Sequence, residues 1–195
     1  MTPHGPAAHA RIRPARVADA ERLAAIHVRS WRAAYAGVLP EAYLATLQPA
    51  SLTQRWRHWV SRTQATSSTA LWVLERAGEV VGYSESGPCA GDRSLVGFSA
   101  EVFTLYLEPA CVGLGLGRAL LEHGLDALAH RGFFWCVVWV LRENRRGRAF
   151  YERAGMRPDG EERLDRVAGE QVAVVRYARA LNPALDFAAL RASWV

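Results

Sequence analysis

The sequence has no lysine: all 24 of its basic residues are arginine, and the net charge over 195 residues is +5. A nucleic-acid interface would need this charge clustered on one face together with aromatic side chains. The densest group, Arg142, Arg145, Arg146 and Arg148, stands instead at the start of a predicted helix, where guanidinium groups could meet the phosphates of a nucleotide. We therefore expect no nucleic-acid partner, and a solvated arginine face with some contact to a nucleotide.

Cysteine and long apolar runs are also scarce. Cys89, Cys111 and Cys136 form no Cys-x-x-Cys pair, which argues against a disulfide framework and a zinc site and favours a reducing cytoplasm. The six histidines have no metal-ligand spacing, so we expect no metal. The longest apolar run, residues 133–141, is far shorter than the roughly 20 residues that span a bilayer. These absences predict a cytoplasmic chain with no membrane partner.

One domain accounts for most of the chain. Half of the 195 residues are hydrophobic, which suffices for one full core, and no repeat or Gly/Ser linker divides them. We expect a flexible N-terminus over residues 1–10, without the apolar stretch of a signal peptide, and a domain over residues 11–181. Residues 182–195 form a C-terminal extension with one apolar helical face. That face should dock on the domain or on a second subunit, as in a homodimer.

Hydrophobic periodicity changes between strand and helix along the domain. Short alternating or continuous apolar runs predict strands at 11–14, 69–75, 79–86, 100–107, 133–141, 156–161 and 171–180. Apolar residues at helical spacing predict helices at 19–34, 41–47, 52–62, 116–131 and 145–154. Asp19 is expected to cap the first helix. This order predicts an α/β (α+β) fold, in which helices flank a mixed central sheet.

A glycine-rich loop joins the strand at 100–107 to the helix that follows. Gly113, Gly115 and Gly117 occupy every second position of this loop. Free backbone N–H groups and the positive end of the helix dipole would bind an anion here, and glycine lets a phosphate approach the backbone. On spacing alone, a tight turn that needs glycine for φ > 0 explains the loop equally well. A dinucleotide-binding fingerprint does not, because Arg118 stands where its third glycine belongs.

The residues after the loop favour the anion site. The next predicted strand is followed by Asn144, then by Phe150-Tyr151 and Gly155. Together with Val112-Gly-Leu-Gly-Leu-Gly117, these residues resemble the GNAT superfamily of acetyl-CoA-dependent N-acyltransferases, in which such a loop precedes an Asn and a Phe-Tyr pair. Val112 departs from the pattern, since the family usually has Arg or Gln there. The resemblance covers nearly the whole chain.

The resemblance implies where acetyl-CoA binds. Two parallel strands splay apart in the family, and here they would be residues 100–107 and 133–140, with the coenzyme in the gap. The residues expected to contact it lie on the first strand, in the glycine loop and at the next helix: Leu105, Tyr106, Leu107, Val112, Gly113, Leu114, Gly115, Leu116, Gly117, Arg118, Asn144 and Arg148. Val112 would contribute only its backbone, and Asn144 could also cap its own helix. Leu107 N–H is the candidate for polarising the thioester carbonyl.

The resemblance also implies the catalytic groups. Tyr151 would be the general acid that protonates the departing thiolate. Glu101 resembles the acidic position that some members use as the general base, and Glu85 and Glu108 compete with it. His27 is a weaker candidate for the base. Each of the three carboxylates could equally be a surface group near a strand end.

The predicted activity is the transfer of an acetyl group from acetyl-CoA to a primary amine in a ternary complex. The acceptor would be a small molecule or a peptide, bound by Trp31, Tyr35 and Glu85. The two aromatic residues could equally be packing groups. A non-catalytic acetyl-CoA sensor of the same fold is the alternative, and binding without turnover would identify it.

Overall fold

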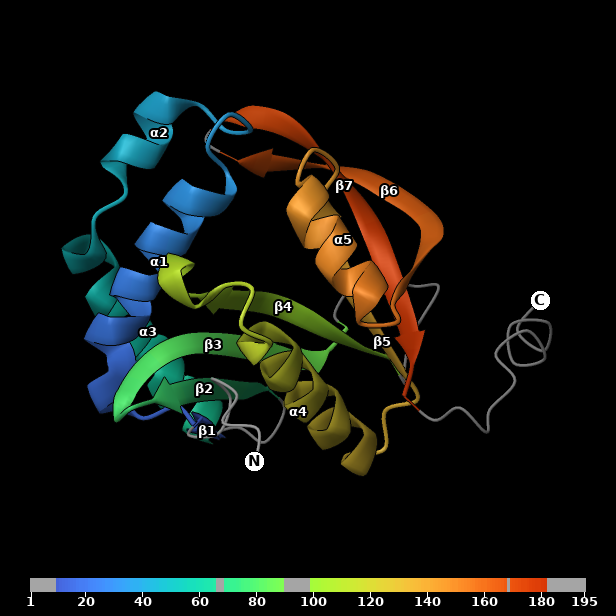
Figure 1. The fold of residues 1–195 in the computed structure, drawn as a ribbon, viewed down its shortest axis with the longest axis horizontal. Helices are drawn as coiled ribbons and strands as arrows, with labels where there is room; N and C mark the ends of the chain where they lie inside the picture. The colour runs from blue at the N-terminus through green and yellow to red at the C-terminus, as the bar shows by residue number, and fades with distance from the viewer. Residues whose placement is uncertain (1–9, 66–68, 90–98, 168, 182–195) are drawn as a thin grey trace, which may run out of the picture.

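The computed structural model describes residues 10–65, 69–89, 99–167 and 169–181. Residues 1–9 and the C-terminal extension 182–195 lie outside the described residues, and so do the predictions made for them. In the described part, helices lie on both faces of one sheet (Figure 1).

Seven strands form the sheet, in the order β1-β2-β3-β4-β5-β7-β6. They are β1 (Ala10–Pro14), β2 (Ala70–Arg76), β3 (Glu79–Pro88), β4 (Ser99–Leu107), β5 (Trp135–Leu141), β6 (Arg157–Val167) and β7 (Glu170–Ala180). The β4–β5 pair is parallel, and the other pairs are antiparallel. The sequence correctly predicts this mixed central sheet.

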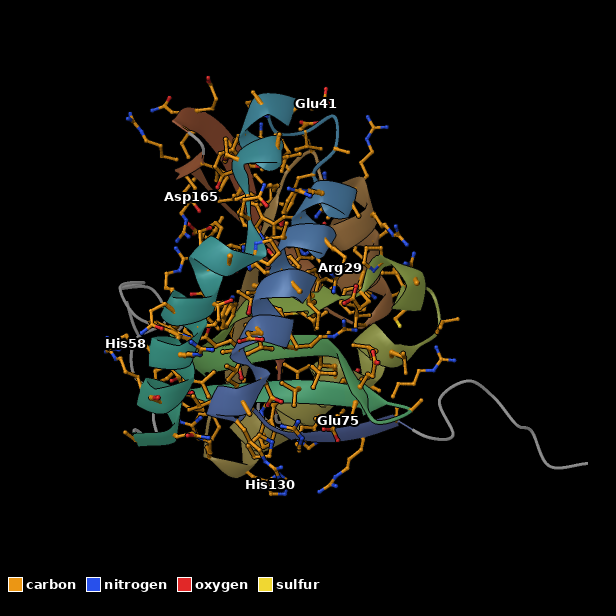
Figure 2. The ribbon with its side chains drawn as sticks, turned by 90° about the vertical axis from the view of Figure 1, so that its left-hand side faces the viewer. Arg29, Glu41, His58, Glu75, His130 and Asp165 are labelled. Atoms are coloured by element: carbon orange, nitrogen blue, oxygen red, sulfur yellow. The ribbon has the colours of Figure 1, made fainter. Side chains whose placement is uncertain are left out.

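Two groups of helices cover the sheet. The helices are α1 (Ala20–Ala34), α2 (Glu41–Thr46), α3 (Pro49–Ala65), α4 (Leu116–His130) and α5 (Arg145–Arg153). Along β2, Leu71 and Val73 pack with α1 and α3, whereas Leu74 packs with α4. Because neighbouring residues of a strand point to opposite faces, the two groups lie on opposite sides of the sheet. We call them the α1/α3 face, which Figure 2 views, and the α4/α5 face.

Two local predictions differ from the structure. Asp19 holds the N-cap position of α1 but makes no cap bond, because its carboxylate accepts hydrogen bonds from the Arg13 guanidinium at 2.7 and 2.9 Å and from Arg16 N–H at 2.7 Å. Burial opposes ionisation of Asp19, but these donors outweigh it and hold its pKa below the ordinary value. The strand predicted at 156–161 continues to Val167. As an edge strand, it exposes charged residues that resemble a loop in the sequence.

The parallel strands β4 and β5 diverge soon after they meet. Their register includes only Ser99↔Trp135, Ala100↔Cys136 and Glu101↔Val137. On its other edge β4 stays paired with β3 as far as Leu107, with a bulge at Phe103. A bulge bends its strand and breaks the regular ladder. The second half of β4 therefore has one open edge, and this edge positions the candidate site.

Candidate active site

A cavity of about 510 Å³ lies where β4 and β5 diverge. Its walls come from both strands, from the C-terminal end of α1, from the loop before α4, and from α5. It is lined by Tyr35 of α1, on the α1/α3 face, and by Tyr151 of α5, on the α4/α5 face. Side chains from both sides of the sheet therefore meet in this cavity.

The glycines of the loop before α4 serve two purposes. Gly113 and Gly115 have φ angles of 88° and 79°, so the turn itself requires glycine at both positions. A Cβ at Gly117 would lie 3.2 Å from Leu107 Cδ1 and 3.4 Å from the Phe150 ring, so this glycine permits close packing. The explanation by a tight turn therefore holds for two of the three glycines.

The same turn leaves backbone amides free at the start of α4. The helix begins at Leu116, and Ala119 N–H donates to Gly115 O at 3.1 Å, so the helical amides before Ala119 have no carbonyl within the helix to bind. The loop residues that line the cavity are Val112, Gly113, Gly115, Gly117 and Arg118. The side chains of Leu114 and Leu116 pack into the core instead. Free amides at the positive end of a helix can bind an anion.

The open edge of β4 supplies further backbone groups. Leu105, Tyr106 and Leu107 all line the cavity. Glu108 N–H donates to Val81 O of β3 at 2.8 Å. Because successive residues of a strand turn their N–H groups to opposite edges, the amides of Leu105 and Leu107 face the open edge. The amide of Tyr106 turns toward β3 and is therefore not available at the open edge.

Helix α5 brings Asn144 and Tyr151 to the cavity. Asn144 Oδ1 accepts a hydrogen bond from Gly147 N–H at 2.9 Å, so Asn144 does cap its helix. Burial, and then the nearby Tyr35 phenol, raise the pKa of Tyr151. Among the described residues, none forms a hydrogen bond with the Tyr151 hydroxyl. A protonated phenol without a protein partner can donate to a group in the cavity.

The arginine of α5 that the sequence predicts as a coenzyme contact is not one of those that line the cavity. Arg148 does not line the cavity, because its Nε donates to Tyr177 OH at 3.1 Å and its Nη1 to a backbone carbonyl at 3.2 Å. Arg146 and Arg153 line the cavity instead. Their spacing from Phe150, by four and three residues, places all three on one helical face. This spacing could have identified the two arginines from the sequence.

An aromatic cluster of α1 and β4 forms the wall on the α1/α3 face. Tyr35 lines the cavity, and its hydroxyl lies 3.3 Å from that of Tyr106. Trp31 packs behind it, with ring centroids 5.0 Å apart, and is not part of the lining. His27 Nδ1 lies 2.9 Å from Tyr83 OH, and burial together with a nearby arginine lowers the pKa of His27 to about 4. Of these residues, the structure brings Tyr35 and Tyr106 to the cavity.

The three candidate carboxylates have different surroundings. Glu101 precedes the divergence of β4 from β5 and does not line the cavity; its carboxylate lies 3.8 Å from Cys89 Sγ. Glu108 pairs with Arg29 at 2.5 Å. Glu85 is buried on β3 and accepts a hydrogen bond from the indole N–H of α3 at 2.6 Å. The structure therefore does not bring Glu101, the first candidate for the base, to the cavity.

Metal and disulfide chemistry have no visible basis in the described part of the chain. Within these ranges, no group of three or more His, Cys, Asp or Glu side chains is placed to hold a metal ion. Cys89, Cys111 and Cys136 are free. None of the described helices is long and apolar enough to cross a membrane.

Fold and site together define a class of protein. A sheet with one diverging parallel pair, free amides at a helix N-terminus and a buried phenol are suited to acyl transfer from a carrier that bears phosphates. The chain belongs to the acetyltransferase (GNAT) family, whose model matches residues 23–156.

Individual relatives agree with this assignment. An uncharacterised N-acetyltransferase of Bacillus subtilis is 30% identical over 68% of this chain and 72% of the relative. A spermidine N(1)-acetyltransferase of Thermoplasma acidophilum is 23% identical over 79% of this chain and 92% of the relative. The crystal structure of the PaiA N-acetyltransferase of Thermoplasma acidophilum, in complex with coenzyme A, has the same fold: its TM-score is 0.68 at 20% identity, over 88% of this chain and 98% of that one.

Proposed function

We propose that the chain transfers an acetyl group from acetyl-CoA to a primary amine, with both substrates bound at the same time. One observation carries this proposal: the open edge of β4 and the free amides of α4 line a single cavity. The likeness to a solved N-acetyltransferase in complex with coenzyme A supports it. The similarity to a spermidine acetyltransferase supports an amine as acceptor.

The α4/α5 face fits the coenzyme. Its pyrophosphate would accept hydrogen bonds from the backbone amides of residues 113–118, because the Val112 N–H already donates to Pro109 O at 3.3 Å. Arg118 and Arg146 at the cavity wall would add charge. The pantetheine arm would continue along the open edge of β4 and bond the backbone of Leu105. Leu107 N–H points to the same edge and would polarise the thioester carbonyl, as a single-donor oxyanion site.

Tyr151 would protonate the leaving thiolate. A thiol has a pKa of ~8.5 and a phenol one of ~10, so the phenol donates only from a fixed position in a dry site. Tyr151 meets both conditions, because it is buried and fixed on α5 at the cavity wall. Its raised pKa also keeps the phenol protonated until the thiolate forms.

The acceptor would enter from the α1/α3 face. Coenzyme contacts occupy the glycine loop and the β4 edge, whereas Tyr35 and Tyr106 leave two hydroxyls on the opposite wall. An amine that approaches from there could attack the thioester carbon directly, without a covalent intermediate on the protein. A small molecule or a peptide N-terminus would fit this approach.

Two measurements test the proposed function. Calorimetric titration with coenzyme A should show binding at one site per chain. A panel of primary amines with acetyl-CoA should release free thiol, detected by a thiol reagent, in an amine-dependent way. Tight coenzyme binding with no amine-dependent release across the panel would favour a sensor, and absence of coenzyme binding would refute the proposal.

A further inference from the structure

Glu85 is a buried carboxylate without a cationic partner. The residue is 5% exposed, and its Oε1 accepts a hydrogen bond from Trp59 Nε1 at 2.6 Å. In the described part of the chain, no arginine or histidine forms an ion pair with it. Burial raises the pKa of Glu85, and the Trp59 hydrogen bond opposes that shift. Burying a charge without a counter-ion costs free energy. No ion pair among the described residues offsets this cost for Glu85.

Glu85 lies next to the cavity through its neighbour on β4. It pairs across the strands with Thr104, and residues directly opposite each other have Cβ atoms roughly 4.5–5.5 Å apart on one face. Thr104 lines the cavity, yet its Oγ1 is buried without a hydrogen-bond partner among the described residues. The bulge at Phe103 falls directly before Thr104. A residue that lines the cavity therefore carries a buried, unpaired hydroxyl directly across the strands from the buried carboxylate of Glu85.

Glu101 differs from Glu85 in its position and its neighbours. It lies on the other side of the bulge, where β4 is still paired with β5. Burial raises the pKa of Glu101 as well, but Arg163 opposes this shift, and so does the hydrogen bond that Cys89 Sγ donates to its carboxylate. Its carboxylate therefore has a cation and a hydrogen-bond donor nearby, and Glu101 does not line the cavity.

We propose that Glu85 binds the ammonium group of the acceptor and takes its proton, with the hydroxyl of Thr104 as the relay. This inference rests on the proposed acetyl transfer. The ammonium ion supplies the missing counter-ion, and its approach gives Thr104 Oγ1 the partner that it lacks. Thr104 accepts a proton from the ammonium ion and passes its own to Glu85, which leaves a neutral amine.

The protons balance in the complete reaction. The amine nitrogen forms a bond to the thioester carbon while the C–S bond breaks, and Tyr151 gives its proton to the thiolate sulfur. The nitrogen loses its second proton as the amide forms, and this proton restores the Tyr151 phenol. The proton held by Glu85 returns to solvent. One ammonium ion and one thioester thus give one amide, one thiol and one released proton.

The surroundings of Glu85 also restrict the class of acceptor. One carboxylate can pair with one ammonium group. Phe103, which lines the cavity, is 38% exposed, and Trp59, which holds Glu85, is 37% exposed. Apolar rings next to a single charge favour a primary amine with an apolar or aromatic body over a polyamine. 2-Phenylethylamine represents the first type and spermidine the second.

The decisive experiment compares Glu85→Gln with Glu101→Gln. The amide keeps an oxygen for Trp59 Nε1 but cannot take a proton. With acetyl-CoA and 2-phenylethylamine, kcat/KM of Glu85→Gln should fall about 100-fold or more, and the acidic limb of its pH profile should disappear. Glu101→Gln should stay within about twofold of the wild type. Both variants should bind coenzyme A with unchanged affinity. Normal activity in Glu85→Gln, or loss only in Glu101→Gln, would overturn the assignment.

Two further variants separate the relay from a structural role. Thr104→Val removes a hydroxyl that has no partner, so the melting temperature should hold while kcat/KM falls; Thr104→Ser should restore activity. Trp59→Phe removes a hydrogen bond that lowers the pKa of Glu85, so the acidic limb of the profile should move to higher pH. Thr104→Val with full activity would exclude the relay, and an unmoved limb in Trp59→Phe would exclude Glu85 as the titrating group.

The wild type distinguishes failure of this inference from failure of the proposed function. If no amine is acetylated although coenzyme A binds, acetyl transfer itself is wrong. If spermidine is preferred over 2-phenylethylamine, the apolar acceptor class is wrong, and the Glu85→Gln comparison is then made with spermidine.

Discussion

The two faces of the diverging sheet are built in different ways. On the α4/α5 face the candidate coenzyme site consists mainly of backbone groups, from one edge of β4 and the adjoining turn into α4. On the α1/α3 face the candidate acceptor site consists of side chains from α1, α3, β3 and β4, which are far apart in the sequence. A backbone site tolerates many side chains but few conformations. A side-chain site depends on the face to which each residue points.

The two kinds of site should therefore respond differently to mutation. Changes in backbone conformation should weaken coenzyme binding, whereas single polar atoms should control the reaction with the amine. Variants that alter one property and spare the other can test this division.

The largest effect is expected for Tyr151→Phe. The ring still packs, but the proton for the thiolate is lost, so kcat should fall ~10²–10⁴-fold while coenzyme affinity hardly changes. Stability should also hold, because the hydroxyl has no partner among the described residues. Tyr177→Phe is a matched control: its hydroxyl bonds Arg148 and Glu152, so its loss should cost about 1 kcal/mol of stability and leave kcat intact. A Tyr151→Phe variant with near-normal kcat would leave solvent as the acid.

Gly115→Val should give the next largest effect, on coenzyme binding. Gly115 has a φ of 79° and caps α4, and a Cβ there meets no atom within 4 Å. The cost is therefore backbone strain and not a clash, and relief of that strain should turn the free amides away from the anion. The dissociation constant of coenzyme A should rise about tenfold, which corresponds to ~1.4 kcal/mol.

Gly124→Ala provides the control for this prediction. Gly124 lies inside α4 with open space around a Cβ, so alanine should stabilise the helix by about 0.5–1 kcal/mol without affecting the coenzyme. If folded Gly115→Val binds coenzyme A like the wild type, the loop acts only as a turn.

A smaller effect should distinguish two arginines of α5. Arg146 lines the cavity, whereas Arg148 is held by Tyr177. Arg146→Ala should weaken coenzyme A binding several-fold, as expected for the loss of about 1 kcal/mol from an exposed charged contact, and more at low salt. Arg148→Ala should leave the affinity unchanged. Titrations at two salt concentrations check both, and the reverse result would restore the assignment made from sequence.

These outcomes follow from what a sequence can specify. The turn at Gly113 and Gly115 and the cap at Asn144 are local, so residue type and spacing suffice to predict them. The sequence prediction chose Arg148 because of its position within α5. The direction of its side chain depends on a hydrogen bond to Tyr177 of β7, which is distant in the sequence. The sequence prediction of Glu101 as the first candidate for the base takes no account of the bulge at Phe103, because the pattern of residues in the strand does not reveal it. Roles of Tyr151 and Glu85 in catalysis stay predictions.

The smallest expected effect is on the melting temperature, and it tests whether the buried carboxylate on the acceptor side lowers the stability of the fold. Burial raises the pKa of Glu85 above its usual 4.5, so the folded state favours the protonated carboxyl. The resulting stability is present below the unfolded-state pKa and is lost as pH rises through the raised folded-state pKa. Glu85→Gln is neutral at every pH, so its melting temperature should exceed that of the wild type by more at pH 8 than at pH 4.

A gain of a few degrees is expected at pH 8, since about 1 kcal/mol corresponds to roughly 2–4 °C for a chain of this size. Glu161→Gln removes the same charge from the exposed strand β6 and is the control for the change in net charge. If the Glu85→Gln difference is the same at pH 4 and pH 8, the buried carboxylate carries no strain, and burial would no longer explain how it competes for the proton of the amine. A difference that grows with pH would instead show that the acceptor side gives up stability to keep the carboxylate of Glu85 buried.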